Sequence, residues 1–351
     1  MAGVSTPRLA AAVSNAGGLG SIGVGASAPE AARNSIEEVK KLTDRPFNVN
    51  VFVHEREEND ESKGRAWIEA LRPTFSRFGA DPPTHLREIY NSFADDKEML
   101  QVLLDTEPAV VSFHFGLPAA KVIDALKSRG IVLFASVTSL AEAQAVEQTA
   151  VDVVVAQGYE AGGHRGIFDP TGPDDQLSTT VLTRLLVSRC SKPVIAAGGI
   201  MDGAGINSVL ALGAIAAQLG TAFVCCDESS ADAAYRQAML PSDTAAAAAA
   251  AAAQHTVMTS AISGRPARCL SNAFTALGQT LTSSSRDNAD VPVTPGYPYT
   301  YDIGKALHAA AKAKGENGFG AQWAGQGAPL ARKMPAAELM KKLEEEMGSQ
   351  M

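Results

Sequence analysis

The sequence is poor in cysteine and holds no cluster of metal-binding residues. Its four cysteines are Cys190, Cys225, Cys226 and Cys269, and none of them forms a C-x-x-C pair or lies near two histidines. This spacing predicts neither a zinc site nor a disulfide framework. We therefore expect free buried thiols and no bound metal.

Positive charge and long apolar runs are also scarce. The chain has 30 lysines and arginines against 38 aspartates and glutamates, a formal net charge of -8, whereas nucleic-acid binding usually needs a basic face. No apolar run reaches the length of a membrane span, which is about 20 residues. The first residues do not follow the pattern of a signal peptide. We expect a cytoplasmic protein that acts on small molecules and has no nucleic-acid or membrane partner.

Short apolar runs alternate with helical patterns through the first two thirds of the chain. Helical patterns such as 119–129 and 140–148 separate most of the runs, and Thr6-Pro7 is typical of a helix start. The predicted strands are residues 19–23, 47–53, 109–113, 131–136, 151–156, 193–197 and 215–219. This alternation predicts an α/β fold of the TIM-barrel type. Because such a barrel needs eight strands, we expect that its first strand is missing before Met1; a seven-stranded variant is the alternative.

Three regions follow from this pattern. Residues 1–226 form the predicted barrel, with a charged helical insertion at about 55–104 that is long enough to cover the barrel mouth. Residues 227–302 form a smaller helical and loop region, a substrate or lid domain, which includes an alanine run at 245–253. Helices within 303–351 are expected to pack on the barrel.

The proline-rich segment 286–301 reads as a loop. Its tyrosines Tyr297, Tyr299 and Tyr301 are candidates for the substrate pocket. Simple packing of the loop on the barrel explains them about as well.

The strongest functional signal is a histidine that follows two glycines after an apolar strand. Gly162, Gly163 and His164 come shortly after the run 151–156, and ligands bind at the carboxyl ends of such strands. Glycine lets the backbone approach a ligand closely, and imidazole exchanges protons near neutral pH. His164 is therefore the candidate proton-transfer group.

Two later strands run into further glycines. Gly198-Gly199 follows the strand at 193–197, and Gly220-Thr221 follows the strand at 215–219. Exposed amides at this place in a barrel can surround a phosphate. Tight turns are the alternative, but the coincidence of both glycine signals favours phosphate.

Amide side chains stand at the ends of three strands. Asn50, Gln157 and Gln218 could converge on the edge of an uncharged heterocycle such as an isoalloxazine. A structural hydrogen bond is nearly as good an explanation for Asn50. His114, between two phenylalanines at another strand end, could share the pocket, although a structural histidine is the more frequent case.

Several segments resemble the nitronate monooxygenase family, formerly called 2-nitropropane dioxygenases. The specific motif is Gly158-Tyr159-Glu160-Ala161-Gly162-Gly163-His164-Arg165-Gly166. The other matching segments are residues 1–5, 50–52, 112–118, 196–200, 218–223 and 323–327. The resemblance therefore covers nearly the whole chain.

The resemblance implies an FMN-dependent TIM barrel with a smaller helical substrate domain. It implies that His164 is the catalytic base, and that Met1, Ala2 and Gly3 border the flavin ring. The remaining cofactor contacts would be Asn50, Gln157, Gly162, Gly163, Gly198, Gly199, Gln218, Leu219, Gly220 and Thr221. His114, Tyr297 and Tyr299 are the expected substrate-pocket residues.

The implied activity is oxidation of alkyl nitronates or nitroalkanes by O2 to a carbonyl compound and nitrite. The alternatives are an NAD(P)H-dependent flavin reductase of the same superfamily, acting on a quinone or an enoyl thioester, and a non-catalytic FMN-binding or truncated homologue. The sequence does not predict the oligomeric state.

Overall fold

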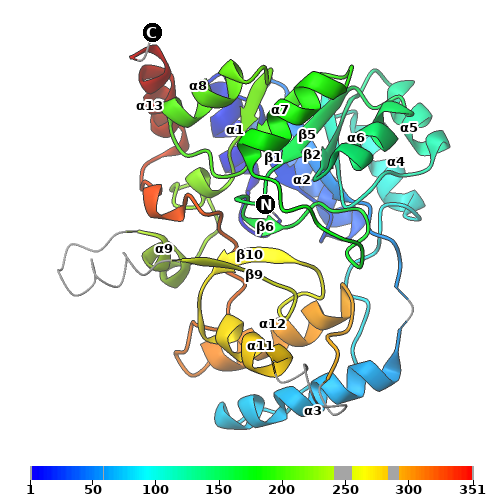
Figure 1. Ribbon diagram of the computed structural model, residues 1–351, viewed down its shortest axis with the longest axis vertical. Helices are drawn as coiled ribbons and strands as arrows, with labels where there is room; N and C mark the ends of the chain where they lie inside the picture. The colour runs from blue at the N-terminus through cyan, green and yellow to red at the C-terminus, as the bar shows by residue number, and fades with distance from the viewer. Residues whose placement is uncertain (1, 58, 241–254, 284–291, 350–351) are drawn as a thin grey trace.

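The structure is a computed structural model that describes residues 2–57, 59–240, 255–283 and 292–349. A parallel sheet with helices around it forms one part of the molecule, and a small antiparallel sheet with three further helices lies below it in Figure 1. None of the described helices is long and apolar enough to cross a membrane. The alanine run at 245–253 lies outside the described residues.

The parallel sheet contains each of the seven predicted strands. Its order is β1-β2-β3-β4-β5-β7-β8, and its strands are β1 (Gly20–Gly23), β2 (Phe47–Phe52), β3 (Val110–His114), β4 (Val132–Val137), β5 (Val153–Gln157), β7 (Val194–Ala197) and β8 (Ala216–Gln218). Every neighbouring pair is parallel. No pairing joins β8 to β1 within the described residues, so this α/β sheet is curled but open between these two strands.

Helices cover the outer face of this sheet (Figure 1). They are α1 (Pro7–Asn15), α2 (Pro29–Leu42), α4 (Lys97–Thr106), α5 (Ala120–Lys127), α6 (Leu140–Glu147), α7 (Thr179–Arg189) and α8 (Gly203–Ala211). Thr6 caps α1 as predicted, because its hydroxyl accepts the Leu9 N–H at 3.0 Å. Strand residues such as Val111 and Leu133 are fully buried against helix residues such as Leu126. Each such side chain contributes roughly 1.5–3 kcal/mol of hydrophobic stabilisation.

The second part of the molecule joins segments that are far apart in the sequence. Its antiparallel sheet has the order β6-β10-β9, formed by β6 (Gly163–His164), β10 (Ala267–Leu270) and β9 (Thr256–Thr259). Below it lie α3 (Glu61–Arg77), α11 (Ala273–Ser283) and α12 (Tyr299–Lys312) (Figure 1). Trp67, Phe274 and Ile303 are buried together in one hydrophobic cluster of these helices. The sheet therefore links His164 to this second part.

The α-helices of the C-terminal segment pack on different parts of the molecule. The helix α13 (Ala336–Gly348) packs on α1 and α8, beside the parallel sheet. The helix α12 instead packs on α3. Its apolar residues Ile303, Leu307 and Ala311 recur at helical spacing and are fully buried in the second cluster.

Two further sequence predictions need correction. The segment 286–301 is not a loop throughout, because α12 begins at Tyr299 with Pro298 in the N-cap position; residues 284–291 lie outside the described part. The insertion at 55–104 contains α3, but residues 78–96 between α3 and α4 are not helical. The helix α4 packs on α2 beside the parallel sheet. The short helices α9 (Ala233–Met239), η1 (Thr221–Phe223) and η3 (Ala328–Leu330) complete the described elements.

Candidate active site

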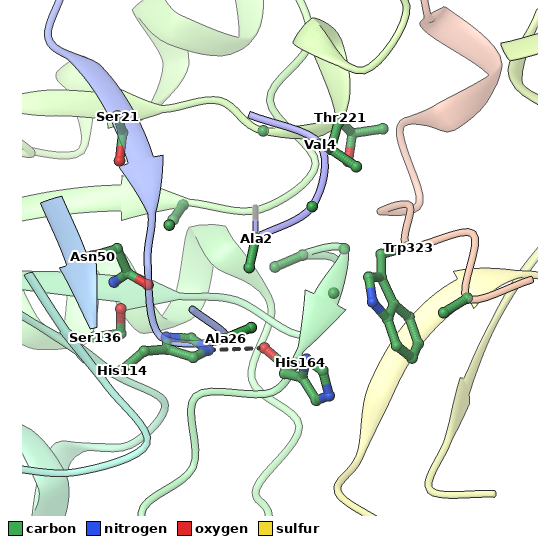
Figure 2. A pocket seen from close by; sticks show the side chains of 18 of the residues that line it. Ala2, Val4, Ser21, Ala26, Asn50, His114, Ser136, His164, Thr221 and Trp323 are labelled. Carbon is green, nitrogen blue, oxygen red and sulfur yellow. Dashed lines mark hydrogen bonds between the residues drawn. The ribbon is translucent and has the colours of Figure 1, made fainter. Parts of the chain in front are cut away.

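A cavity of about 700 Å³ lies at the carboxyl ends of the parallel strands. It brings together most of the residues predicted for the site, and Figure 2 shows several of them around one space. The predicted residues that line it are Ala2, Gly3, Asn50, His114, Gln157, Gly162, Gly163, His164, Gly198, Gly199, Gln218, Gly220, Thr221 and Tyr297. Met1 lies outside the described residues. Leu219 does not line the cavity and packs with apolar side chains instead.

Tyr299 is the substrate-pocket prediction that the structure places elsewhere. It borders a second cavity of about 260 Å³, whereas Tyr297 and Tyr301 line the large one. Tyr299 and Tyr301 both lie in α12. Residues two apart on a helix point in nearly opposite directions, because each residue turns the helix by about 100°. Tyr301 therefore takes the place that was predicted for Tyr299.

His164 lies in β6, where it pairs with Ala267 of β10. Its Nε2 is 2.9 Å from the Ser263 hydroxyl. The imidazole is surrounded by aromatic rings, with centroid distances of 5.0 Å to Trp323 and 5.6 Å to both Phe115 and Tyr297. In Figure 2 the His164 side chain lies beside Trp323, below Ala2. The base candidate therefore stands in a defined, largely apolar position.

The surroundings of His164 keep it neutral. Burial, together with charge repulsion from His114, Arg265 and His54, lowers its pKa to about 3. Burial also lowers the pKa of His114 to about 4. An imidazole that is neutral at pH 7 has a lone pair with which to accept a proton. His164 is therefore in the protonation state that a general base needs.

Two predicted residues hold the backbone of the His164 loop. Gln157 donates from Nε2 to the His164 carbonyl at 3.0 Å, and its Oε1 accepts the Gly166 N–H at 2.7 Å. His114 Nε2 lies 3.1 Å from the same carbonyl, the dashed line in Figure 2. A carbonyl only accepts, so we assign the ring proton of His114 to Nε2. Both ends of the Gln157 amide are thus engaged within the protein.

The three strand-end amides are not equivalent. Asn50 donates to the Ser112 hydroxyl at 2.9 Å, so its amide nitrogen is also engaged. Among the described residues, only the Gln218 amide of the three makes no hydrogen bond, and it is exposed to the cavity. Of the three amides predicted to converge on one ligand, Gln218 and the side-chain oxygen of Asn50 are therefore the groups left for it.

Glycine is favoured at positions 162 and 163 for different structural reasons. A Cβ on Gly162 would lie 2.3 Å from the Gly325 nitrogen, so this position allows close packing of two backbone segments. Gly163 has φ +77°, and a Cβ there would have no atom within 4 Å. The sequence predicted that both glycines let the backbone approach a ligand. Only Gly163 borders open space.

Sequence reasoning gave no role to several residues of the site. Ser263, Arg265 and His54 surround His164 from the turn before β10 and from the end of β2. Trp323 stood in a matching motif but without a function. Ser263 and Arg265 lie in the segment Ser263-Gly264-Arg265-Pro266, whose composition indicates a turn and nothing more. Only the pairing of β6 with β10 brings them to His164.

A family model and the curated relatives of the chain carry one family name, whereas a solved structure of FabK from Thermotoga maritima is also similar, at 29% identity and a TM-score of 0.70 over 99% of this chain and 90% of that chain. The family model described as nitronate monooxygenase matches residues 1–346. The chain belongs to the nitronate monooxygenase family. A relative named nitronate monooxygenase from Paraburkholderia phytofirmans is 57% identical over 347 residues, which cover 99% of this chain and 90% of the relative. Another of that name, from Pseudomonas aeruginosa, is 51% identical over 349 residues and covers 99% and 94%.

A solved structure supports the same assignment of this chain to an enzyme family. The nitroalkane oxidase from Streptomyces ansochromogenes is 35% identical, with a TM-score of 0.84 over 99% of this chain and 93% of that chain. Membership of the nitronate monooxygenase family makes the chain an oxidoreductase and confirms the resemblance on which its site residues were predicted.

The neutral histidines of this family member predict a loss of stability in mild acid. Burial lowers the pKa of His54 and His114 to about 4 and that of His164 to about 3, from 6.5. Below pH 6.5 the unfolded chain therefore binds protons that the folded chain excludes. The free energy of unfolding should fall between pH 6.5 and 5 by up to about 1 kcal/mol per histidine and pH unit.

Urea unfolding at a series of pH values measures this slope. His54→Gln removes one of the three groups and should make the slope shallower. A free energy of unfolding that stays constant from pH 6.5 to 5 would contradict the prediction.

Proposed function

We propose that the chain oxidises alkyl nitronates with O2, in an FMN-dependent reaction, to a carbonyl compound and nitrite. His164 acts as the base when the substrate is a neutral nitroalkane. The observation that carries the proposal is the position of a neutral histidine in the cavity that the glycine-rich strand ends line. The names of the relatives agree with this substrate class.

The residues of the cavity fit FMN. Its volume of about 700 Å³ lies within the usual range of cofactor sites, roughly 300–1,000 Å³. Added side chains at Gly163 and Gly220 would meet no atom within 4 Å, so the backbone there borders open space. Among the described residues, the N–H groups of Gly199 and Gly220 have no hydrogen-bond partner in the protein. Unpaired amides of this kind suit a phosphate.

Each part of the cofactor has candidate partners. The segments Gly198-Gly199 and Gly220-Thr221 would hold the phosphate, whereas Ala2, Gly3, Asn50, Gly163 and Gln218 would border the ring system. Bound FMN would supply the electron-transfer chemistry between the nitronate and oxygen. The fit of these residues to FMN supports the proposal that the chain is a flavin-binding barrel with a second domain over its strand ends.

The hydrogen bonds around His164 assign its tautomer. The Ser263 hydroxyl lies 3.2 Å from the Arg265 carbonyl and 2.9 Å from Nε2 of His164. Because the carbonyl only accepts, Ser263 donates to it, and the Ser263 oxygen accepts a hydrogen bond from the protonated Nε2 of His164. Nδ1 of His164 then keeps the lone pair, and it is the atom that takes the α-proton of a nitroalkane.

Removal of the α-proton from the substrate makes His164 a stronger base. The negative charge that develops on the nitronate favours the protonated imidazole, because a nearby opposite charge raises a histidine pKa. The His164 imidazole, whose pKa burial lowers to about 3, thus becomes a better acceptor as the anion forms. Gln157 and His114 keep the loop fixed through the His164 carbonyl during this change.

The overall reaction balances without a further reductant. Two nitronates and one O2 give two carbonyl compounds and two nitrite ions: each C–N bond breaks, the nitrogen leaves as nitrite, and each carbon takes one oxygen atom. No nicotinamide is required for this balance.

Reconstitution with FMN tests the proposal. The purified chain, incubated with FMN and desalted, should keep a flavin absorption spectrum, consume O2 and release nitrite when ethyl nitronate is added. Anaerobic NADH should leave the flavin oxidised. Rapid bleaching by NADH without nitrite release would support the reductase alternative, and a chain that takes up no FMN would overturn the proposal.

A further inference from the structure

Arg265 is a buried cation that has no carboxylate partner among the described residues. Its side chain is 3% exposed, and Nε makes no hydrogen bond. The equally buried Arg165 provides a contrast, because it forms an ion pair with Asp174 at 2.8 Å. An unpaired buried charge costs stability. A function at this position would explain why the charge is kept.

The geometry connects Arg265 to the loop of His164. Its guanidinium donates to the carbonyls of Ile167 and Phe168, at 3.3 Å for the latter, in the segment that directly follows β6. Its Cζ lies 4.4 Å from the centre of the Phe115 ring. That ring meets the His164 imidazole edge to face, 5.6 Å away at 89°. Phe115 thus separates the guanidinium from the imidazole by one ring.

Phe115 is held in place by its surroundings. It is 1% exposed and has φ +79°, a left-handed conformation that is uncommon outside glycine. Such strain persists only where neighbouring structure enforces it, and it is frequent at functional sites. The spacing between Arg265 and His164 is therefore fixed.

Of the three groups whose charge acts on His164, Arg265 is the one that is charged at pH 7. His114 from β3 and His54 after β2 also act on His164, but both are neutral at pH 7 because their pKa values are about 4. Tyr297 and Tyr301 contact the imidazole as rings, and burial raises the pKa of both phenols, so they are uncharged. Arg265 stays protonated, although burial lowers its pKa to about 10.

The acidic groups near Arg265 are engaged elsewhere or exposed. Glu142 accepts the N–H groups of Thr138 and Phe168. Asp169 accepts from Thr171, and Glu57 is exposed to solvent. None of them lies at ion-pair distance from the guanidinium in the described part of the chain. The Arg265 charge therefore acts on the cavity residues His114 and His164 with no described carboxylate at ion-pair distance to offset it.

Two lysines line the same cavity and also bear on its charge. Lys312 is paired with Asp232 at 2.6 Å, whereas Lys305 donates to the Tyr90 hydroxyl at 2.6 Å. Lys305 contacts the rings of Tyr90 and Tyr301, so it adds positive potential on the α12 side. Arg265 instead contacts the ring of Phe115, which lies between its guanidinium and the His164 imidazole.

We propose that Arg265 determines substrate specificity, because its buried charge favours nitronates that arrive already ionised over neutral nitroalkanes. The inference rests on the proposed oxidation of nitronates. A nitronate binds as an anion and receives the whole stabilisation by this charge. A neutral nitroalkane must first give its proton to His164, which creates a new cation beside Arg265. The stabilisation of the anion and the repulsion of the imidazolium then offset each other.

Removal of the charge tests the proposal. Arg265→Gln keeps a donor for the Ile167 carbonyl without the charge, and Arg265→Lys keeps the charge without the planar fork. The ratio of kcat/KM for ethyl nitronate to that for nitroethane should fall about tenfold in the glutamine variant. It should stay within about twofold of the wild-type ratio in the lysine variant. Arg265→Met is a second neutral variant for which the glutamine result is expected.

A purely structural role predicts a different result. If Arg265 only holds the Ile167 and Phe168 carbonyls, the lysine and glutamine variants lose activity together on both substrates and the ratio is unchanged. That outcome would overturn the proposal.

A second measurement does not depend on turnover. NMR titration of histidine-labelled protein follows the His164 imidazole, assigned by its absence in His164→Asn. Its pKa should rise in Arg265→Gln and stay near the wild-type value in Arg265→Lys. An unchanged pKa in the glutamine variant would overturn the role of the charge. Absence of nitrite release by the wild type would instead sink the proposed function while leaving this titration interpretable.

Discussion

His164→Asn is expected to abolish oxidation of neutral nitroethane while oxidation of preformed ethyl nitronate continues within about tenfold of the wild-type rate. Asparagine keeps a polar group near Ser263, which lies 2.9 Å from the imidazole, but it has no basic lone pair. Positioned proton transfer contributes roughly 10²–10⁴-fold to a rate, and the loss should fall in this range for the substrate that still carries its α-proton. Initial rates of nitrite release from both substrate forms measure the effect.

A second histidine variant separates the base from general damage. His85 is exposed and does not line the cavity, so His85→Asn should keep both activities. Thermal unfolding and flavin absorbance verify that His164→Asn retains its fold and cofactor. An equal loss on the neutral and the ionised substrate would remove His164 from the role of base and leave it as a binding residue.

The parallel sheet could be predicted from the sequence because most of its strands are buried on both faces. Runs such as Val153–Gln157, with all five residues buried, are continuous and β-branched, which separates them from amphipathic helices. The order of strands follows from right-handed crossovers between neighbours. The site was predicted for the same reason, since the carboxyl end of every such strand is known once the strand is known.

The second sheet could not be predicted in this way. β6 has two residues and β9 has four partly exposed ones, so neither produces a periodic pattern. Their partner β10 lies about a hundred positions after β6 in the chain, and its pairing partners are Gly163 and His164. Long-range pairing of short strands carries no local signal. Ser263 and Arg265 were missed because their roles depend on that pairing.

The position of Tyr299 illustrates a smaller failure. Three prolines within residues 292–298 indicated a loop, yet proline is tolerated at the start of a helix, where its missing N–H has no partner to lose. The helix α12 begins at Tyr299, and its rotation takes Tyr299 to the small cavity. The composition of the segment was interpreted correctly for residues 292–298 and not beyond them.

Gly162→Ala and Gly163→Ala are expected to fail in different ways. A methyl group on Gly162 would lie 2.3 Å from the Gly325 nitrogen and 2.5 Å from the Ala324 carbonyl carbon. Backbone atoms cannot yield as a flexible side chain can, so we expect a loss of about 3 kcal/mol or more in the free energy of unfolding. Gly163→Ala meets no atom and should cost only about 1–2 kcal/mol for its left-handed backbone.

The second variant should instead weaken flavin binding, because its methyl group enters the space that we assign to the ring. Gly130→Ala is the matched control: Gly130 has φ +73° with no atom near its Cβ, and it does not line the cavity. Both variants pay the same backbone cost, so any additional loss of FMN affinity in Gly163→Ala comes from the cavity. Flavin fluorescence titration measures that affinity, and urea unfolding without flavin measures stability. Equal FMN affinity in the two variants would place the ring away from Gly163, and a Gly162→Ala protein as stable as the wild type would show that the segment 324–325 can move aside.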